Sequence, residues 1–328
     1  MLTYGKQNVP VFKIIRGENG KDSIIDMVVN IMLEGNVEDS WLSGNNKGIL
    51  PTETQKNTCY ALAMKTDFDA IEDYGKALLE DILRRHMHLS AATVRIRERR
   101  WNRIGKDHRH AFRSSRDPVE RTCEIRVSRR DKSKSTQVDL VRSGVSGVKL
   151  LKTTQSGFDG FIRDKYVFFF WISEGIFLSR LAFTFNTYIR YTNLEPVGKG
   201  AKGGANRILS TIMDATWTYV RPAPWGNFVC SNENALNALL ETFSGPRDTG
   251  VFSRSLQETT WKMGKALLRT VPRVESVKIE TPNVHFYRYP LEQFSLENPN
   301  VVFQSTDPET TASGRIETYV TRHDLSRL

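Results

Sequence analysis

Cysteine is scarce in this chain, which has only three such residues among 328, at Cys59, Cys123 and Cys230. Their wide, irregular spacing matches no zinc-binding motif, and an odd number cannot pair completely into internal disulfides. Disulfide frameworks are typical of small secreted proteins. The composition therefore predicts a protein of a reducing compartment without structural disulfides.

Targeting and cofactor-binding signatures are missing as well. Residues 1–6 lack the apolar run of a secretory signal peptide. The glycine-rich segment 198–204 has no preceding strand, so it does not form a dinucleotide-binding fingerprint. The one long apolar stretch, at 167–185, is barely long enough to cross a bilayer and is interrupted by Glu174 and Arg180. We therefore expect no membrane partner.

Acidic residues are outnumbered, 37 against 47 lysines and arginines, so the net charge is +10. This surplus fits three anionic partners, namely nucleic acid, a membrane surface or a small acidic substrate, and it equally fits an ordinary basic surface. Arg95, Arg97 and Arg99 alternate along a predicted strand and so share one face. That pattern is more typical of a solvated sheet surface, and we expect no nucleic-acid partner.

The pattern of apolar residues predicts strands and helices in an order that occurs twice. The pentapeptide Gly-Lys-Ala-Leu-Leu occurs at 75–79 and again at 264–268, which supports an internal duplication. A polar, arginine-rich region with a loop is expected at 105–135. In the helix predicted at 67–88, one face carries Phe68, Ile71, Tyr74, Leu78 and Ile82. The predicted strands are 9–16 and 23–33 (joined by a turn at 17–20), 91–101, 136–142, 148–154, 160–166, 212–220, 274–280 and 284–289, and the predicted helices are 54–64, 67–88, 231–243 and 255–269.

These elements predict an α+β fold in which antiparallel sheets carry helices on one face. An open sheet of this kind has two edges with unpaired backbone groups, which must be paired or covered. Pairing between copies of the chain would solve this problem by closing the sheets into a barrel.

Several short motifs carry residues suited to binding a small, flat, anionic heterocycle. Phe158 can supply a stacking platform, Arg207 a bidentate cation and Gln257 an amide that both donates and accepts hydrogen bonds. The motifs, in collinear order over most of the chain, are Tyr4-Gly5-Lys6, Pro-Thr-Glu-Thr-Gln-Lys-Asn-Thr at 51–58, Lys-Thr-Thr-Gln-Ser-Gly-Phe-Asp-Gly-Phe-Ile-Arg-Asp-Lys-Tyr at 152–166, Ser255-Leu256-Gln257 and Pro-Asn-Val-His at 282–285. Together they closely resemble the urate oxidase (uricase) family.

The resemblance implies an oxidase that uses no metal, flavin or other cofactor and converts urate, dioxygen and water to 5-hydroxyisourate and hydrogen peroxide. It also implies two tandem tunnel-fold (T-fold) units, which close into a barrel when the chain assembles as a homotetramer with active sites at subunit interfaces. The corresponding segments are a first unit at 1–143, a second unit at 144–310 and a C-terminal tail at 311–328.

The resemblance further assigns roles to individual residues. Lys6, Thr52 and His285 match a catalytic proton relay, in which the lysine and the histidine polarise the threonine hydroxyl and pass protons on. Thr52 and Glu53 are expected to reach a site on the neighbouring subunit. Asn283 matches the residue that positions dioxygen or water above the ring. The implied substrate-binding residues are Thr52, Glu53, Phe158, Arg207, Leu256 (through its backbone), Gln257 and Asn283.

Two departures from the family pattern bear on activity. Most of the family has Thr-Asp where this chain has Thr52-Glu53, and an unusual insertion occupies 168–204. We interpret the insertion as a translated intron in preference to a flap or partner-binding loop. The alternatives to an active urate oxidase are an inactive descendant impaired by the insertion and a pterin- or purine-handling tunnel-fold relative, such as a GTP cyclohydrolase or a dihydroneopterin aldolase.

Two histidine pairs resemble metal ligands, His86 with His88 and His108 with His110. No cysteine or carboxylate cluster accompanies either pair at a suitable spacing, so we expect structural or solvent-facing histidines and no metal site. The resemblance itself accounts for His110, since the family pattern includes a His-Ala-Phe such as the one at 110–112.

The chain ends in Ser326-Arg327-Leu328, a close variant of the Ser-Lys-Leu peroxisomal signal. A tripeptide alone carries little information, but an oxidase that releases hydrogen peroxide fits a peroxisome. The ending therefore predicts peroxisomal localisation, with the peroxisomal import receptor as a partner.

Overall fold

The structure is a computed structural model that describes residues 2–17, 20–105, 108–114, 119–130, 135–158, 162, 207–222, 225–299 and 301–326. The insertion at 168–204 and the last two residues, Arg327 and Leu328, lie outside the described residues. The strand predicted at 160–166 also lies outside them, apart from Ile162.

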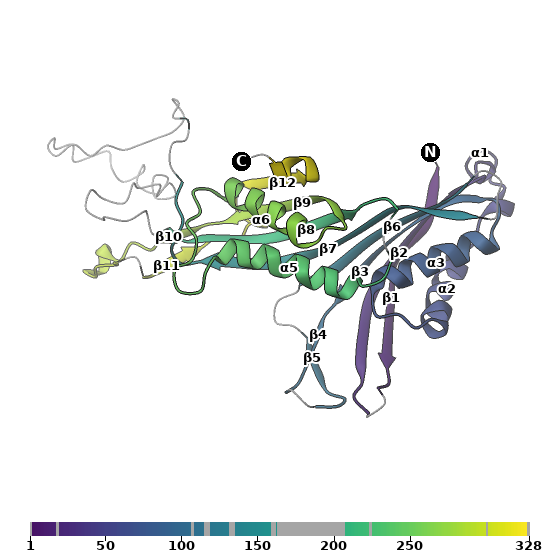
Figure 1. Ribbon diagram of the computed structural model, residues 1–328, viewed down its shortest axis with the longest axis horizontal. Helices are drawn as coiled ribbons and strands as arrows, with labels where there is room; N and C mark the ends of the chain where they lie inside the picture. Colours follow the sequence, from purple (N-terminus) through teal and green to yellow (C-terminus); the bar gives the residue numbers. More distant parts are fainter. Residues whose placement is uncertain are drawn as a thin grey trace.

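Eight strands form one antiparallel sheet that runs through both halves of the chain (Figure 1). β1 and β12 are its two edges, and no other described strand pairs with their outer sides. The strands, in spatial order, are β1 (Thr3–Ile15), β2 (Ser23–Gly35), β3 (Leu89–Arg99), β6 (Glu120–Arg129), β7 (Thr136–Lys152), β8 (Leu209–Tyr219), β9 (Val274–Val284) and β12 (Arg315–Thr321).

Two pairs of helices pack against this sheet, one pair from each half of the chain (Figure 1). The long helices are α2 (Thr52–Lys65), α3 (Ile71–Arg85), α5 (Phe228–Ser244) and α6 (Leu256–Thr270). The shorter helical elements are α1 (Asp39–Leu42) and the 3-10 turns Asn46–Gly48, Glu292–Phe294 and Arg322–Ser326. Two small antiparallel pairs of strands lie outside the main sheet. They are β4 (Trp101–Arg103) with β5 (Phe112–Ser114), and β10 (Phe286–Arg288) with β11 (Phe303–Ser305). Among the described helices, none is both long enough and apolar enough to cross a membrane.

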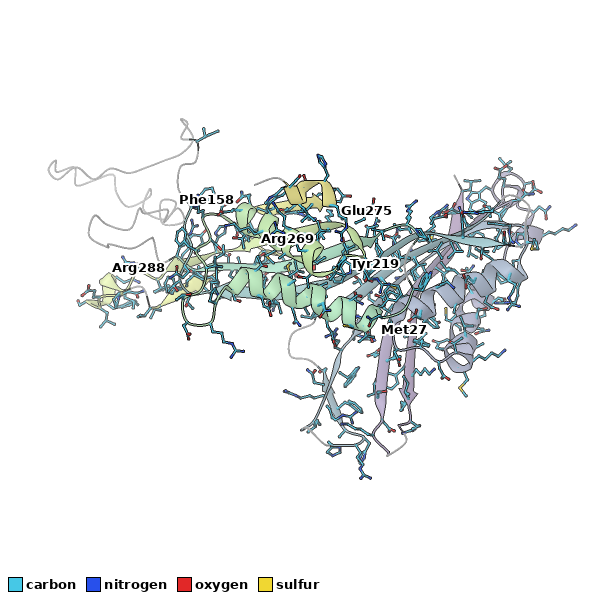
Figure 2. All side chains as sticks on the ribbon, in the orientation of Figure 1. Met27, Phe158, Tyr219, Arg269, Glu275 and Arg288 are labelled. Atoms are coloured by element: carbon cyan, nitrogen blue, oxygen red, sulfur yellow. The ribbon has the colours of Figure 1, made fainter. Side chains whose placement is uncertain are left out.

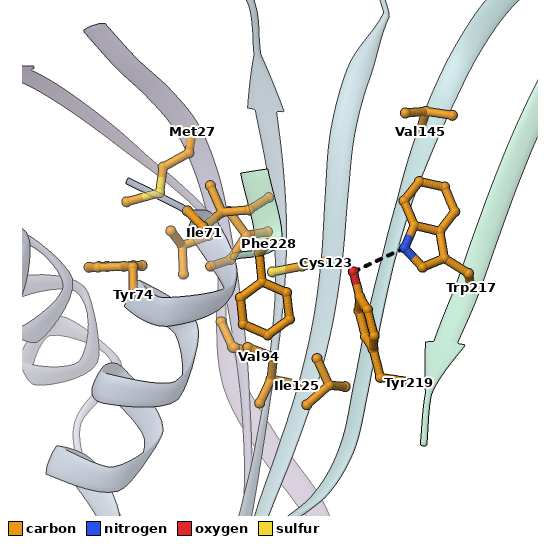
Figure 3. Close-up of a cluster of buried hydrophobic side chains, with 14 of the residues drawn as sticks. Met27, Ile71, Tyr74, Val94, Cys123, Ile125, Val145, Trp217, Tyr219 and Phe228 are labelled. Atoms are coloured by element: carbon orange, nitrogen blue, oxygen red, sulfur yellow. Dashed lines mark hydrogen bonds between the residues drawn. The ribbon is translucent and has the colours of Figure 1, made fainter. Parts of the chain in front are cut away.

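The hydrophobic core lies between the sheet and the helices, because the strands alternate apolar and polar side chains. In β2, Met27, Val29, Ile31 and Leu33 are all fully buried. The predicted apolar face is confirmed, since Ile71, Tyr74, Leu78 and Ile82 of α3 are buried, as is Phe68 just before the helix. Figure 3 shows this cluster, in which the Trp217 indole donates a hydrogen bond of 3.1 Å to the hydroxyl of Tyr219.

The opposite face of the sheet carries charged side chains in complementary pairs. Arg95 lies 2.9 Å from a Glu124 oxygen, and Arg99 lies 3.0 Å from an Asp26 oxygen. Arg97 pairs with Glu120 at 3.6 Å. These contacts confirm the predicted solvated sheet face, where carboxylates of neighbouring strands neutralise the arginines.

The repeated pentapeptide marks the closest contact between helix and sheet in each half. A Cβ atom on Gly75 of α3 would lie 2.9 Å from the Ile125 side chain, and one on Gly264 of α6 would lie 2.6 Å from Val320. Glycine therefore lets both helices approach their strands closely. The two helices have matching packing as well as matching sequence.

Three element predictions need correction. The region 105–135, expected to be polar with a loop, contains the strand β6. Buried and exposed residues alternate along β6, but the sequence hides this pattern because one of the buried residues is charged. That residue is Arg121, which pairs with Glu72. The strands predicted at 136–142 and 148–154 are one strand, β7, with a bulge near Gly147, which has a positive φ, and a second irregularity at Asp139 in its pairing with β6. The segment 311–328 includes β12, which pairs with β9. The boundaries of the two predicted units stay a prediction, because one continuous sheet spans them.

Candidate functional site

Lys6 lies on the edge strand β1, next to an irregularity in its pairing with β2. Asn8 adopts a left-handed φ of 56°, and its backbone N–H donates a hydrogen bond of 2.7 Å to the Asn30 side chain. Gly5 is required for close backbone approach, since a Cβ there would lie 1.8 Å from the carbonyl oxygen of Ile31. These contacts fix the backbone on both sides of Lys6.

Thr52 and Glu53 begin α2, and the preceding segment is anchored to β1. The Leu50 N–H donates to the Tyr4 hydroxyl at 2.8 Å, and the Gln55 amide donates to the Leu50 carbonyl at 3.0 Å. These two bonds hold the start of α2 against the strand that carries Lys6. We call Lys6, Thr52 and Glu53 the amino-terminal half-site.

The Glu53 carboxylate is directed along its own helix, 2.5 Å from the Lys56 ammonium. That hydrogen bond lowers the pKa of Glu53, and Lys6 makes a smaller electrostatic contribution in the same direction. A helix start also leaves the backbone N–H groups of its first turn without intrahelical partners, so position 53 offers both a carboxylate and a backbone N–H to a ligand.

Phe158 and Arg207 are joined through backbone hydrogen bonds of the segment after β7. The Gly157 N–H donates to the Ser253 carbonyl at 2.9 Å, and the Arg207 N–H donates to the Ser156 carbonyl at 3.4 Å. Phe158 keeps 40% of its surface exposed, which suits a stacking platform better than a core position.

Leu256 and Gln257 open helix α6, after Ser255. The Ser255 hydroxyl caps the helix by accepting a hydrogen bond of 3.1 Å from the Glu258 N–H. Leu256 is buried and Gln257 is exposed. The backbone N–H of Leu256 is among those that a helix start leaves without an intrahelical partner, and its role in binding stays a prediction.

Asn283 and His285 lie at the end of β9, beside the start of β8. His285 is fixed by Thr306, whose N–H donates to the His285 carbonyl at 2.8 Å and whose hydroxyl accepts from the His285 N–H at 2.9 Å. The His285 ring also stacks on Tyr287 at 5.8 Å. Burial lowers the pKa of His285, and the charge of nearby Arg207 lowers it further.

These contacts bring six of the predicted residues into one region of the fold. We call this group the carboxy-terminal half-site, and its members are Phe158, Arg207, Leu256, Gln257, Asn283 and His285. Sequence reasoning assigned no role to Ser156, Ser253 and Thr306, which hold the group together, although Ser156 lies within a quoted motif.

One chain keeps the two half-sites apart. Four strands, β2, β3, β6 and β7, lie between β1 and β8 in the sheet. At about 4.8 Å per strand, β1 and β8 lie about 24 Å apart across the sheet. Figure 1 places α2 and β10 at opposite ends of the molecule, and Figure 2 places Phe158 at the β10 end. The predicted Lys6-Thr52-His285 relay is therefore not assembled within one chain.

A separate open hollow of about 270 Å³ lies on the charged face of the sheet. Arg95, Arg97, Glu124 and Arg142 are among its lining residues, and it includes none of the predicted site residues. Arg95 and Arg142 both pair with Glu124, so these charges are already engaged with one another.

The histidine pairs do not form a metal centre in the part of the chain that the structure describes. No group of three or more metal-ligating side chains gathers there. The His108 and His110 rings lie 4.8 Å apart, but Nδ1 of His108 accepts a hydrogen bond from the Ala111 N–H. A structural role accounts for His108.

The fold and the two half-sites define a class of α+β proteins, in which one face of an antiparallel sheet carries helices and strand ends carry aromatic, cationic and amide groups. The family model "Uricase" matches residues 2–126 and 201–317. The chain belongs to the uricase family. It is 30% identical to the uricase of Dictyostelium discoideum over 324 residues, which cover 97% of this chain and 96% of that protein.

Two further comparisons agree over nearly the full length. The uricase of Danio rerio is 28% identical over 328 residues, covering 99% of this chain and 95% of the relative. The crystal structure of uricase from Arthrobacter globiformis superimposes with a TM-score of 0.77 at 27% identity, covering 98% of this chain and 93% of that one.

Proposed function

We propose that the chain is a urate oxidase, which oxidises urate with dioxygen and water to 5-hydroxyisourate and hydrogen peroxide on the route of purine degradation towards allantoin. Urate gives up two electrons and two protons, dioxygen takes them to become hydrogen peroxide, and water supplies the new hydroxyl. The observation that carries the proposal is the grouping of Phe158, Arg207, Gln257 and His285 in a uricase-family chain.

Each proposed contact uses a group that suits urate. The Phe158 ring would stack on the purine, the Arg207 fork would bind one anionic edge, and the Gln257 amide would bind another. The Leu256 N–H adds a donor at the start of α6. Asn283, beside His285, is proposed to hold dioxygen or water above the ring.

The proposed relay consists of Lys6, Thr52 and His285. His285 has a lowered pKa, so it is neutral at physiological pH and can accept a proton. In the proposed assembly a second copy brings Lys6 and Thr52 to His285, because four strands separate β1 from β8 within one chain. Placement and electrostatics then assist the chemistry without a metal or flavin.

The assembly proposed is a homotetramer in which sheets of different chains close into a barrel. Both edges of the sheet, β1 and β12, are open within the described chain. Exposed apolar side chains also flank both half-sites, as expected of surfaces that meet a partner. They are Trp41 and Leu42 on α1, Tyr60 and Met64 on α2, and Tyr289, Phe294, Leu296 and Val301 between β10 and β11.

We further propose that the protein acts in peroxisomes. The support is the ending Ser326-Arg327-Leu328 and the toxicity of the hydrogen peroxide that the reaction would release. A fluorescent fusion with this ending should concentrate in peroxisomes, and the same fusion without the tripeptide should remain diffuse. Identical distributions of both fusions would contradict the localisation.

The test of the activity is the loss of urate absorbance by the purified chain, with hydrogen peroxide measured in parallel. We expect one peroxide per urate consumed. A variant without most of 168–204 is assayed beside the full chain. Activity of the shortened form alone would mean that the insertion inactivates the enzyme, and inactivity of both forms would favour an inactive descendant or a pterin-handling relative.

A further inference from the structure

Lys152 is the last residue of β7, and its ammonium group is turned towards the connection between α5 and α6. Nζ donates hydrogen bonds of 2.8 Å to the Val251 carbonyl and 2.8 Å to the Ser253 hydroxyl, and it lies 5.2 Å from the centre of the Phe243 ring. Lys152 is half-buried, and burial lowers its pKa. A lysine held away from bulk water by two acceptors has a defined position, unlike an ordinary surface lysine.

Ser253 is the centre of a buried polar group that extends to α6. Its hydroxyl also accepts a hydrogen bond of 2.9 Å from the Thr259 hydroxyl. The Ser253 backbone also forms two hydrogen bonds with the segment after β7. The Ser253 N–H donates to the Gln155 carbonyl at 2.9 Å, and the Ser253 carbonyl accepts from the Gly157 N–H at 2.9 Å. Lys152 therefore links the 251–253 segment to the end of β7, and the backbone hydrogen bonds link it to the residues that follow β7.

Ser156 extends the group to the start of β8. Its hydroxyl donates a hydrogen bond of 2.5 Å to the Arg207 carbonyl, and Ser156 is itself buried. Three segments therefore meet at one polar group, which we call the Lys152 cluster (Lys152, Ser156, Ser253 and Thr259). Each segment carries one proposed urate contact, namely Phe158, Arg207 and Gln257.

We propose that Lys152, acting through Ser253, is a positioning residue that sets the relative placement of Phe158, Arg207 and Gln257. This inference rests on the proposed function. Lys152 itself does not touch urate. Its bonds to the 251–253 backbone and to Ser253 oppose separation of the two segments, and a site of this kind loses affinity when its groups shift by about 1 Å. The relay residues lie outside the cluster, so the expected effect falls on urate binding more than on proton transfer.

The experiment compares Lys152→Met with Lys149→Met, which changes an exposed lysine of the same strand. Urate affinity is measured by calorimetry under argon, where binding occurs without turnover, and kcat and KM are measured in air. For Lys152→Met we expect Kd and KM to rise about tenfold, as for one lost charge-assisted hydrogen bond, while kcat changes less than about twofold. Lys149→Met should match the wild type. Lys152→Arg should recover most of the affinity, since its fork can reach both acceptors.

A second variant keeps the inference testable if Lys152→Met folds poorly. Ser253→Ala retains the lysine but removes one acceptor, so Kd should rise about threefold to fivefold, and the double variant should be weakened by less than the product of the two effects. Unchanged Kd in both single variants, or a lower Tm with unchanged Kd, overturns the positioning role and leaves the proposed function standing. Failure of the wild type to bind urate overturns the proposed function first.

Discussion

His285 is held by neighbours that favour its neutral form. Thr306 fixes its backbone, Tyr287 stacks on its ring, and burial together with Arg207 lowers its pKa. A histidine with a lowered folded pKa is more than half neutral at pH 6.5, where an ordinary histidine is half protonated. Below about pH 6.5 the unfolded chain takes up a proton that the folded protein resists, so this residue's contribution to stability is lost as the pH falls through its folded pKa.

The corresponding prediction concerns the imidazole itself. In the substrate-free protein, NMR titration should give His285 a pKa below 6.5. In Arg207→Gln this pKa should rise but stay below 6.5, because the repulsion is removed while burial, the larger cause, persists. An unshifted pKa in the variant would mean that Arg207 does not lie close to His285.

Glu72 is a buried carboxylate that joins the two halves of the chain. It accepts hydrogen bonds of 3.1 Å from Arg121, 2.5 Å from the Ser143 hydroxyl and 2.9 Å from the Asn232 amide. Glu72 belongs to α3 and Asn232 to α5, so one carboxylate connects both pairs of helices. All four residues are buried, which makes the loss of one partner costly.

We expect Glu72→Gln to lower the free energy of unfolding by about 3–5 kcal/mol, because Arg121 would then lose one of its charged partners inside the protein. The control is Glu80→Gln on the same helix, whose partner Lys76 is partly exposed. It should change stability by less than about 0.5 kcal/mol. Urea unfolding measures the free energy of unfolding of both variants. Similar unfolding midpoints for Glu72→Gln and Glu80→Gln would show that the buried contacts of Glu72 contribute little to stability.

The helices α3 and α6 approach the sheet through equivalent glycines, but their neighbours differ in rigidity. The Cβ of an alanine at position 75 would meet Cδ1 of Ile125 at 2.9 Å, the flexible end of a side chain, and Cγ1 of Val94 at 3.1 Å. At position 264 it would meet Cγ2 of Val320 at 2.6 Å and the Val320 Cβ at 3.2 Å. The shortest contact at position 264 is closer, and it falls on a short β-branched side chain with few other rotamers, so it yields less easily.

Gly264→Ala should therefore destabilise the protein more than Gly75→Ala. An added methyl in a packed core costs about 1–3 kcal/mol, whereas alanine in place of glycine within a helix gains about 1 kcal/mol. From these two effects we expect the free energy of unfolding to change little in Gly75→Ala and to fall by about 1–2 kcal/mol in Gly264→Ala. Thermal unfolding of the two variants measures the difference, and the reverse order would contradict this account.

Element prediction succeeded where one face of an element is apolar and failed where a charge is buried. The faces of α3 and the alternation of β2 follow directly from their sequences. β6 escaped prediction because Arg121, which reads as a surface residue, is buried against Glu72 of α3. β7 was predicted as two strands because Gly147 and its neighbours interrupt the alternation of apolar and polar residues at a bulge.

The candidate site shows the same limit. The motifs indicated which residues would gather, but not what holds them together. Ser253 meets Lys152 from 101 residues away, and Thr306 meets His285 from 21 residues away. Such contacts depend on the completed sheet order, and no local pattern in the sequence encodes them.

At the scale of the whole molecule, the sheet separates the two half-sites, and no described strand pairs with the outer side of either edge. The proposed assembly makes a direct prediction for mixtures of inactive variants. Lys6→Ala damages one half-site and His285→Ala the other, so each should be nearly inactive alone. If the two are denatured together and refolded at equal ratio, about a quarter of the sites should combine intact halves from different chains.

The urate assay on the refolded mixture therefore should recover about a quarter of wild-type activity, from random pairing of the halves. Each variant refolded alone serves as the control. A mixture no more active than its components would mean that every site is built within one chain, against the separation of β1 from β8 in the sheet.

The distance between the half-sites also has a consequence for newly made protein. A solitary chain would hold the urate-binding groups without the lysine and threonine of the proposed relay, and so it would be catalytically silent. Turnover would then begin only above the concentration at which copies meet, and specific activity would fall on dilution. In a cell, such a threshold would delay peroxide release until chains have accumulated in one place.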